Sequence, residues 1–237
     1  MSQLTGKDRE RYVRRTFSRI AAHYDLMNRL MTGGQDVRWR RETIRRARLS
    51  PNERLLDLGA GTGDLAREAL RSQPSAHVVA ADFTLQMMLA GRRHSALSFI
   101  QANALQTPFA ANTFDAVVSG YLMRNVGNLN QAIAEQFRLL KPGGRLVILE
   151  TTVPTRNFLS PFIWLHLHVI IPVLGMLVAG NGEAYRYLPD STEHFVTAEN
   201  LAGQLRTAGF ADVGFRRLMG GTIAIHWGEK PVEKPSS

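Results

Sequence analysis

The stretch from Arg54 to Asp82, RLLDLGAGTGDLAREALRSQPSAHVVAAD, decides the fold of this chain. The run RLLDLG (54–59) has the pattern of a short buried strand, GDLAREALRS that of a helix, and HVVAAD (77–82) that of a second strand. Two strands joined through a helix lie parallel in one sheet. The glycine-rich turn after the first strand marks a place where a ligand can approach the backbone closely.

The rest of the chain continues this alternation. Strands are predicted in LSFIQANA, FDAVVSGY, GGRLVILE, VGFRRL and GTIAIHWG, with helices at 85–94, 129–140 and 197–208. The pattern predicts an α/β fold with a doubly wound, mostly parallel, seven-stranded sheet and helices on both faces. The last two runs, joined by Met219-Gly220-Gly221, are typical of a hairpin that adds an antiparallel strand at or near the edge.

The first 50 residues carry most of the charge. They hold 13 Lys and Arg against 5 Asp and Glu, whereas residues 51–237 hold 16 against 15. A basic amphipathic helix is predicted over 7–31, ended by Gly33-Gly34, and a second helix begins at Asp36. In the second helix one face carries Arg38, Arg41, Arg45 and Arg48, which must meet solvent or an anion. This block favours an anionic partner, lipid or nucleic acid, with a solvated face as the alternative.

An uncharged segment interrupts the alternation at 157–180, NFLSPFIWLHLHVIIPVLGMLVAG. Its length approaches the roughly 20 apolar residues that span a bilayer. Pro161 and Pro172 argue against a span because they break helices. A buried helix pair is one alternative, and an apolar lid over a lipid-like substrate is favoured. The predicted organisation is therefore N-terminal helices (1–50), a main domain (51–230) with the lid insertion at 157–190, and a tail (231–237).

Composition excludes several classes of chemistry. The chain has 237 residues, 44% of them hydrophobic, and no Cys. The length favours one domain with an elaboration, and the lack of Cys excludes disulfides, thiolate metal sites and cysteine nucleophiles. No clustered metal-ligand set occurs, so no metal is expected. The first residues lack the apolar core of a secretory signal, which predicts a cytoplasmic protein.

The turn Asp57-Leu58-Gly59-Ala60-Gly61-Thr62-Gly63 carries the strongest chemical signal. Its spacing is G-x-G-x-G after an acid, whereas a dinucleotide fingerprint has G-x-G-x-x-G. The acid Asp57 disfavours a pyrophosphate and suits an ammonium group, and Gly59 and Gly61 admit a ligand to the backbone. S-adenosylmethionine has that ammonium group, and Asp82, at the end of the next strand, suits its ribose hydroxyls. The alternative is a plain turn with a helix-capping Asp.

Two further loops follow strand ends. Asn103-Ala104 follows the third predicted strand, where the amide suits an adenine edge or, alternatively, a turn. The run from Gly120 to Asn125, GYLMRN, follows the fourth. Because ligands bind at the carboxyl ends of such strands, Arg124 and Asn125 are candidate substrate contacts. The alternative for Arg124 is a surface ion pair.

The motifs DLGAGTGD, FDAVVSGYLMRNVGN and LKPGGRLVILE resemble class I methyltransferases. FSRIAAHYDLMNRLMTGGQDVRWRRETI and the run from YRYLPDSTEHF to IHWGEK are similar to one subgroup, the ubiquinone/menaquinone biosynthesis C-methyltransferases. The likeness runs from about Arg14 to Lys230. The chain has LMRNV where the family often has GLRNV, and Gly120 where some members have a cofactor-contacting Ser, so Gly120 would offer only a backbone contact.

The resemblance implies methyl transfer from S-adenosylmethionine to a ring carbon of a prenylated quinol, demethylmenaquinol foremost. By motif match it implies cofactor contacts from Thr62, Asp82, Asn103 and Ala104. A prenylated substrate fits the apolar segment, and the basic helix fits an anionic membrane, which predicts a peripheral position on the inner face of the cytoplasmic membrane.

The chemistry requires an activated ring carbon, since a phenolate attacks a sulfonium far better than a neutral ring. A phenol titrates near 10, so ionising it at neutral pH requires roughly 4 kcal/mol. Arg124 is predicted to stabilise that charge, with Asn125 as a second donor. The proton acceptor stays open among His23, Asp25, His194 and His226, and so do the choice of naphthoquinol or benzoquinol, the prenyl length and the oligomeric state.

Four other functions compete with this one. A nucleic-acid methyltransferase would explain the basic block, but the Cys of cytosine-C5 enzymes and an N-P-P-Y-type motif do not occur, so no nucleic acid is expected. A nicotinamide oxidoreductase would need the other glycine spacing. The remaining alternatives are a methyltransferase of another lipid or small molecule and a non-catalytic membrane-binding module.

Overall fold

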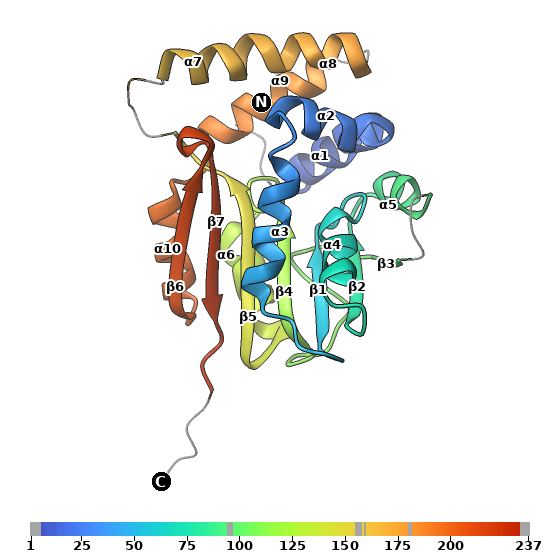
Figure 1. Cartoon of the computed structure of the whole chain (residues 1–237), viewed down its shortest axis with the longest axis vertical. Helices are drawn as coiled ribbons and strands as arrows, with labels where there is room; N and C mark the ends of the chain where they lie inside the picture. The colour runs from blue at the N-terminus through green and yellow to red at the C-terminus, as the bar shows by residue number, and fades with distance from the viewer. Residues whose placement is uncertain (1–5, 94–96, 155–157, 159, 180–181, 233–237) are drawn as a thin grey trace.

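The computed structural model describes residues 6–93, 97–154, 158, 160–179 and 182–232. Within these ranges seven strands form one sheet in the order β3-β2-β1-β4-β5-β7-β6 (Figure 1). Their bounds are β1 (Arg54–Leu58), β2 (His77–Asp82), β3 (Ser98–Gln101), β4 (Phe114–Gly120), β5 (Leu140–Thr151), β6 (Ala211–Leu218) and β7 (Ile223–Glu229). Only β7 runs antiparallel to its neighbours, β5 and β6. The predicted doubly wound sheet and its C-terminal hairpin are confirmed.

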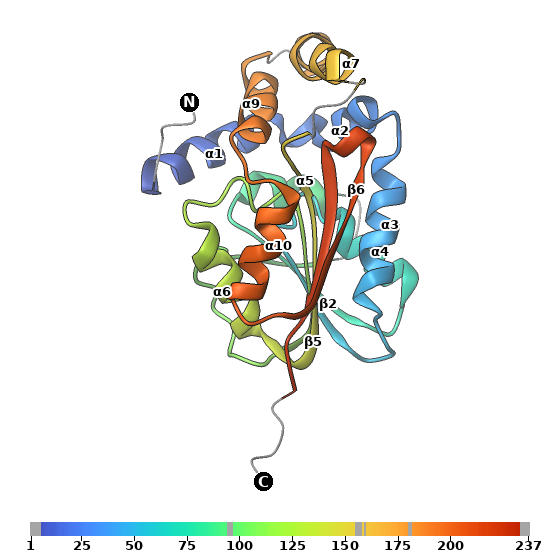
Figure 2. The same cartoon turned by 90° about the vertical axis from the view of Figure 1, so that its left-hand side faces the viewer.

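Helices cover both faces of the sheet (Figure 2). One face carries α3 (Asp36–Ala47) and α4 (Asp64–Ser72), the other α6 (Leu129–Leu139) and α10 (Ala198–Thr207), and α5 (Leu85–Arg92) follows β2. Successive side chains of a strand point to opposite faces, so Leu55 packs in the cluster of Trp39 while Leu56 packs in that of Ile133. Because both faces are buried, β1 has a continuous apolar sequence rather than an alternating one.

A layer of helices lies over the carboxyl ends of the parallel strands (Figure 1). It contains α1 (Gly6–Ile20), α2 (Tyr24–Thr32), α7 (Ser160–Leu165), α8 (Ile171–Ala179) and α9 (Gly182–Glu193). Ile20, Met27, Met31, Ile171 and Tyr185 form the buried core of this layer. The N-terminal helices and the apolar insertion therefore pack against each other, at the end of the sheet where ligands bind in such folds.

The prediction of one helix over 7–31 is wrong. A 3₁₀ turn at Ala21–His23 divides it into α1 and α2. The division allows α1 to lie beside α5 while α2 packs against α8. The predicted end is confirmed, since Gly33 caps α2 with a φ of +57°, which favours glycine.

The apolar insertion is helical from Ser160 to Ala179, including a π turn at His166–Ile170. The predicted break at Pro172 is wrong, because the wider π turn before the proline accommodates its missing N–H and its ring. Most of the helix is exposed: 11% of the Ser160–Val178 window is buried, so a buried helix pair does not hold. By length and composition this one helix of the described residues could cross a membrane. Residues 157 and 180 lie outside the described ranges.

The arginine stripe of α3 is exposed, as predicted. Carboxylates of the chain pair with part of it: Arg45 contacts Glu42 at 2.8 Å, and Arg48 binds Glu229. On α1 the exposed arginines are Arg11, Arg14, Arg15 and Arg19, of which Arg11 lies 3.7 Å from Asp8. Both basic faces are exposed, but only α1 belongs to the helical layer that also carries the exposed apolar helix of 160–179 (Figure 1), so the basic face of α1 is the candidate for an anionic partner.

Candidate active site

The glycine-rich turn follows β1 and leads into α4. Gly59, Gly61 and Gly63 have φ values of +70°, +58° and +88°, a region that side chains disfavour. A Cβ on Gly59 would lie 2.7 Å from Leu122 Cδ1, so this position also lacks space for a side chain. The amides of Gly59 and Ala60 donate to the Ala81 carbonyl at 2.8 and 3.0 Å. These donors therefore hold the turn against β2 instead of standing free for a ligand.

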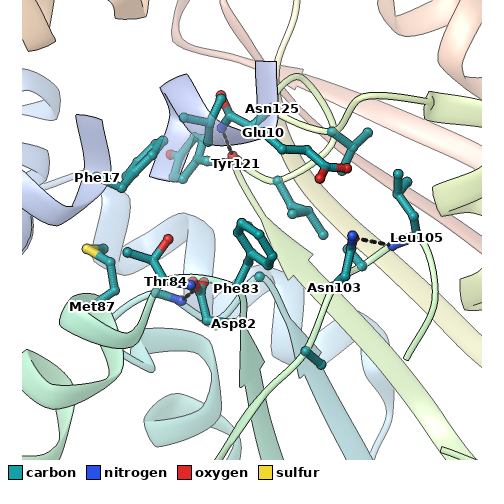
Figure 3. Close-up of a pocket in the computed structure, with 18 of the residues that line it drawn as sticks. Glu10, Phe17, Asp82, Phe83, Thr84, Met87, Asn103, Leu105, Tyr121 and Asn125 are labelled. Atoms are coloured by element: carbon teal, nitrogen blue, oxygen red, sulfur yellow. Dashed lines mark hydrogen bonds between the residues drawn. The ribbon is translucent and has the colours of Figure 1, made fainter. Parts of the chain in front are cut away.

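A first cavity opens over this turn (Figure 3). Its floor comes from the ends of β1, β2 and β4 and from the loop after β3, and α1 and α2 cover it with Val13, Phe17 and Tyr24. The lining includes these predicted site residues: Gly59, Gly61, Asp82, Asn103, Ala104, Gly120 and Asn125. The structure thus brings predicted site residues from Gly59 to Asn125, 66 positions apart, to one cavity. Their roles in binding stay predictions.

Asp82 lies at the end of β2, and its carboxylate ties down two loops (Figure 3). Its oxygens accept the amides of Gly61 and Thr84, each at 2.7 Å. Burial raises the pKa of Asp82. Each carboxylate oxygen keeps a further lone pair, so Asp82 can still accept a hydroxyl from a ligand.

Asn103 has the turn geometry that the sequence left as the alternative. Its side-chain oxygen accepts the Leu105 amide at 2.9 Å (Figure 3). The amide group of Asn125 donates to the Tyr121 carbonyl at 2.8 Å. Both side chains are therefore held in place by the backbone at the edge of the first cavity.

Asp57 and Thr62 line a smaller, third cavity beneath the turn rather than the first one. Asp57 is 1% exposed; its Oδ2 accepts the Ala66 amide at 3.0 Å, and its Oδ1 is buried with no hydrogen-bond partner. Burial raises the pKa of Asp57 to about 7. The third cavity shares Tyr24, Tyr121 and the glycines with the first, so the Asp57 carboxyl lies directly behind the glycine turn.

The N-terminal helices are bonded to the turn. Thr62 donates its hydroxyl to Asp25 of α2 at 2.6 Å. Arg40 of α3 is buried between Asp36 at 2.8 Å and Asp64 at 2.5 Å. None of these pairs was predicted, and the sequence signal for them is weak: Arg40 falls off the exposed stripe, on the apolar side of its helix. The helices that cover the first cavity are therefore tied to its floor.

A second cavity of about 360 Å³ lies beside the first. Its walls are apolar and come from α2, the helix of 160–179 and the turn between β6 and β7, including Met31, Ile163, Leu167, Ile171 and Ile223. The apolar insertion therefore covers a cavity, and its role as a substrate lid stays a prediction. The side of the same helix that faces away from the cavity exposes large apolar side chains to solvent: Trp164, Leu165, Val169, Ile170, Val173, Met176 and Leu177.

Arg124 lies in the wall of the second cavity and is 4% exposed. Its guanidinium binds the carboxylate of Glu150, which is fully buried at the end of β5, and its backbone amide donates to the same carboxylate at 3.3 Å. The alternative of a surface ion pair is wrong, since the pair is buried. Glu150 was not predicted, although an acid at the carboxyl end of a central strand was a usable signal.

Tyr24 and Tyr121 line all three cavities and so form the boundary between them. Tyr121 has a φ of +58°, which is rare for an aromatic residue and common at functional sites. The Arg124 guanidinium lies 5.3 Å from the centre of its ring. Burial raises the pKa of both phenols. The sequence analysis missed both residues.

The candidate proton acceptors lie elsewhere. His23 and His194 are exposed, and Asp25 is bonded to Thr62. His226 is buried in β7 with Nε2 3.0 Å from the Ala198 carbonyl, and burial lowers its pKa to about 4. None of the four lines the second cavity. Among the described residues, no group of three or more His, Asp or Glu could hold a metal ion.

Comparisons with known proteins agree on a family. Residues 5–230 match the model of the ubiE/COQ5 methyltransferase family. A ubiquinone/menaquinone biosynthesis C-methyltransferase UbiE of Desulfotalea psychrophila is 45% identical, over 92% of this chain and 90% of that protein. A demethylmenaquinone methyltransferase of Thermus thermophilus is 41% identical, over 91% of this chain and all of that protein.

Solved structures support the fold. A methyltransferase of Thermotoga maritima, described as dependent on S-adenosylmethionine, superposes with a TM-score of 0.65 at 18% identity, covering 92% of this chain and 99% of that one. A Haemonchus contortus phosphoethanolamine N-methyltransferase in complex with S-adenosyl-L-methionine superposes with a TM-score of 0.59 at 15% identity, covering 79% of this chain and 50% of that one. The class I methyltransferase fold is confirmed.

Proposed function

Because this chain belongs to the ubiE/COQ5 methyltransferase family, we propose that it transfers a methyl group from S-adenosylmethionine to a ring carbon of a prenylated quinol, converting demethylmenaquinol to menaquinol. One observation carries the proposal: a cavity over the glycine turn that holds the Asp82 carboxylate and an apolar cavity under the helix of 160–179 meet at Tyr24 and Tyr121. A methyl donor in the first and a quinol ring in the second would meet at this boundary.

The groups at the first cavity and at the third cavity behind it fit S-adenosylmethionine. Asp82 of the first cavity has lone pairs for the ribose hydroxyls. The buried Oδ1 of Asp57 in the third cavity, which has no hydrogen-bond partner among the described residues, suits an ammonium group. The glycines, which adopt positive φ without strain, bring the backbone to the ligand without side chains in between. When bound there, S-adenosylmethionine supplies an electrophilic methyl group on a sulfonium.

The second cavity fits a prenylated ring. Its apolar walls would bury the ring face and the start of the tail, and burial of apolar surface contributes roughly 25 cal/mol per Å². Arg124 is the fixed cation in this wall, with Glu150 orienting its planar guanidinium. Since a guanidinium has five N–H donors, Arg124 can bind Glu150 and a quinol oxygen together. That contact strengthens as the oxygen gains negative charge, which lowers the barrier to attack by the ring carbon.

The test uses S-adenosylmethionine with a tritiated methyl group. We expect tritium in the lipid extract when demethylmenaquinol is supplied, and none in an added oligonucleotide. A parallel reaction with the corresponding benzoquinol measures ring preference. Label in neither quinol, or label in the oligonucleotide, would overturn the proposal.

We also propose that the protein works as a peripheral protein on the inner face of the cytoplasmic membrane, where its substrate is dissolved. Two surfaces support this. The apolar outer side of the 160–179 helix is suited to the acyl region, and the exposed arginines of α1 are suited to anionic headgroups. Both belong to the helical layer over the strand ends (Figure 1), so one membrane can contact both surfaces. The second cavity lies under the same helix, where a substrate can enter it from the membrane.

A further inference from the structure

The second cavity has one lining side chain with a nitrogen lone pair that can accept a proton. Its titratable lining groups among the described residues are Tyr24, Tyr121, Arg124 and His166. Arg124 stays protonated and is bound to Glu150, and burial raises the pKa of both phenols, so they stay protonated too. His166 alone has a nitrogen lone pair available to a ligand.

The imidazole of His166 has no settled partner at one end. Its Nε2 is buried and makes no hydrogen bond, whereas buried polar atoms are normally bonded. An orphaned nitrogen on a side chain that lines an apolar cavity suggests that its partner is a ligand, which a small rotation of the imidazole would admit. A quinol ring has a hydroxyl at each end, so a ring bound through one oxygen to Arg124 still has a second polar group to satisfy.

His166 and His168 both lie in the π turn, but they have different surroundings. His168 stacks on Trp164 with ring centres 5.0 Å apart, and its Nδ1 lies 3.1 Å from the Trp164 carbonyl. From α9, Glu193 approaches His168 at 3.2 Å rather than His166. Single π turns inside α-helices occur frequently at functional sites. His166 thus lines the second cavity, whereas His168 contacts Trp164 and Glu193.

We propose that His166 is a catalytic residue that accepts a hydroxyl proton of the quinol through Nε2 as the ring carbon attacks the methyl group. The inference rests on the proposed function and deepens it by naming the proton acceptor that the sequence left open. Arg124 and His166 then divide the work: the cation stabilises the oxyanion, and the imidazole removes the proton that creates it.

The step balances as follows. The quinol hydroxyl gives its proton to His166, and the ring carbon forms a bond to the methyl carbon. The methyl–sulfur bond breaks, and its electron pair stays on sulfur, which becomes a neutral thioether. The methylated ring, now a neutral dienone, loses its ring-carbon proton to water, and the oxygen takes a proton back from His166. One proton is released overall, and no oxidant is consumed.

The experiment compares His166→Gln with His168→Gln in the full chain on demethylmenaquinol. For His166→Gln we expect turnover to fall about a hundredfold, the lower range for a lost general base, with little change in the dissociation constant of S-adenosylmethionine. His168→Gln should keep the wild-type turnover. Added imidazole should partly restore a His166→Gly variant.

Several outcomes would overturn the inference. Wild-type turnover in His166→Gln, or an equal loss of turnover in His168→Gln, removes His166 as the acceptor. Unchanged binding of S-adenosylmethionine shows that a slow variant is folded. If the wild-type protein methylates no quinol, both the proposed function and this inference are wrong. If the wild-type protein is active and His166→Gln is equally active, only the inference is wrong.

Discussion

Arg124 is held by a buried carboxylate, and this changes what its removal does. Arg124→Leu should lower turnover on both quinols about a hundredfold, the usual order for a lost oxyanion donor. It also leaves Glu150 buried without its partner, which costs about 3–5 kcal/mol of stability. The double variant Arg124→Leu/Glu150→Leu should recover the melting temperature but not the turnover. Recovery of both would make the pair a scaffold element.

Asp82 is the residue on which cofactor affinity should depend most. Asp82→Asn should weaken S-adenosylmethionine binding by about 1.5 to 3 kcal/mol, since the ribose hydroxyls lose a charged acceptor while the shape of the side chain is kept. Titration calorimetry measures the change. Asp115→Asn is the matched control. Asp115 also accepts a backbone amide, that of Arg54, but it lies at the amino-terminal end of β4, whereas the first cavity lies at the carboxyl end. Equal affinities of the two variants would remove Asp82 from the site.

Asp57 should make the unliganded protein less stable as pH rises. Its folded pKa is raised to about 7, so the folded state prefers the protonated carboxyl, and the unfolded state is already ionised at pH 6. Between pH 6 and 8 this carboxyl should lower the free energy of unfolding by about 1.4 kcal/mol, or about 3–6 °C in melting temperature, relative to Asp57→Asn. The comparison with Asp57→Asn is needed because His226, whose pKa is lowered to about 4, acts in the opposite direction over this range. A difference between the two proteins that does not change from pH 6 to 8 contradicts the assignment.

At the scale of elements, the helix of 160–179 has two sides with different roles. Ile163 and Leu167 line the cavity, so Ile163→Ser and Leu167→Ser should raise the KM for long-chain quinol and spare a tail-less analogue. Leu165 and Leu177 are 45% and 78% exposed and do not line it. Leu165→Ser and Leu177→Ser should leave the KM in detergent unchanged and weaken vesicle binding. A KM effect from the outer pair would contradict this division.

The limits of the elements followed from the sequence where local signals are strong. The prediction for β2 matches the observed bounds, and Gly33 ends α2 as expected. The break at Ala21–His23 and the π turn at His166–Ile170 were missed. Neither has a local marker strong enough to predict it, because the helical layer packs α1, α2 and α8 against partners that are distant in the chain.

At the scale of the molecule, the basic face of α1 should decide attachment to anionic membranes. Pelleting with anionic vesicles should fall as salt rises, and fall about a hundredfold in partition coefficient when Arg11, Arg14 and Arg15 are changed to Gln, at roughly 1 kcal/mol for each charge. The control changes three exposed arginines of α3, Arg38, Arg41 and Arg45, to Gln. Equal losses in both triple variants, or equal pelleting with neutral vesicles, would contradict a specific membrane face.

The sequence by itself determined the α/β sheet, the glycine turn after β1 and the position of Asp82 at the next strand end. These features depend on the hydrophobic periodicity of short segments and on the residue types at turns, and both are local properties of the sequence. The site predictions at the first cavity followed, because the carboxyl ends of parallel strands meet at one edge of a sheet whatever the side chains elsewhere.

Only the tertiary structure decided which groups meet. The Arg124–Glu150 pair, the hydrogen bond from Thr62 to Asp25, and the shared cavity of Arg124 and His166 join residues 26, 37 and 42 positions apart. Such contacts depend on how crossover helices and the insertion fold back over the strand ends, and no period or turn signal encodes that distance. Packing of the helical layer places His166 at the second cavity and leaves its Nε2 without a hydrogen-bond partner. No local sequence signal distinguishes His166 from the other histidines in this way.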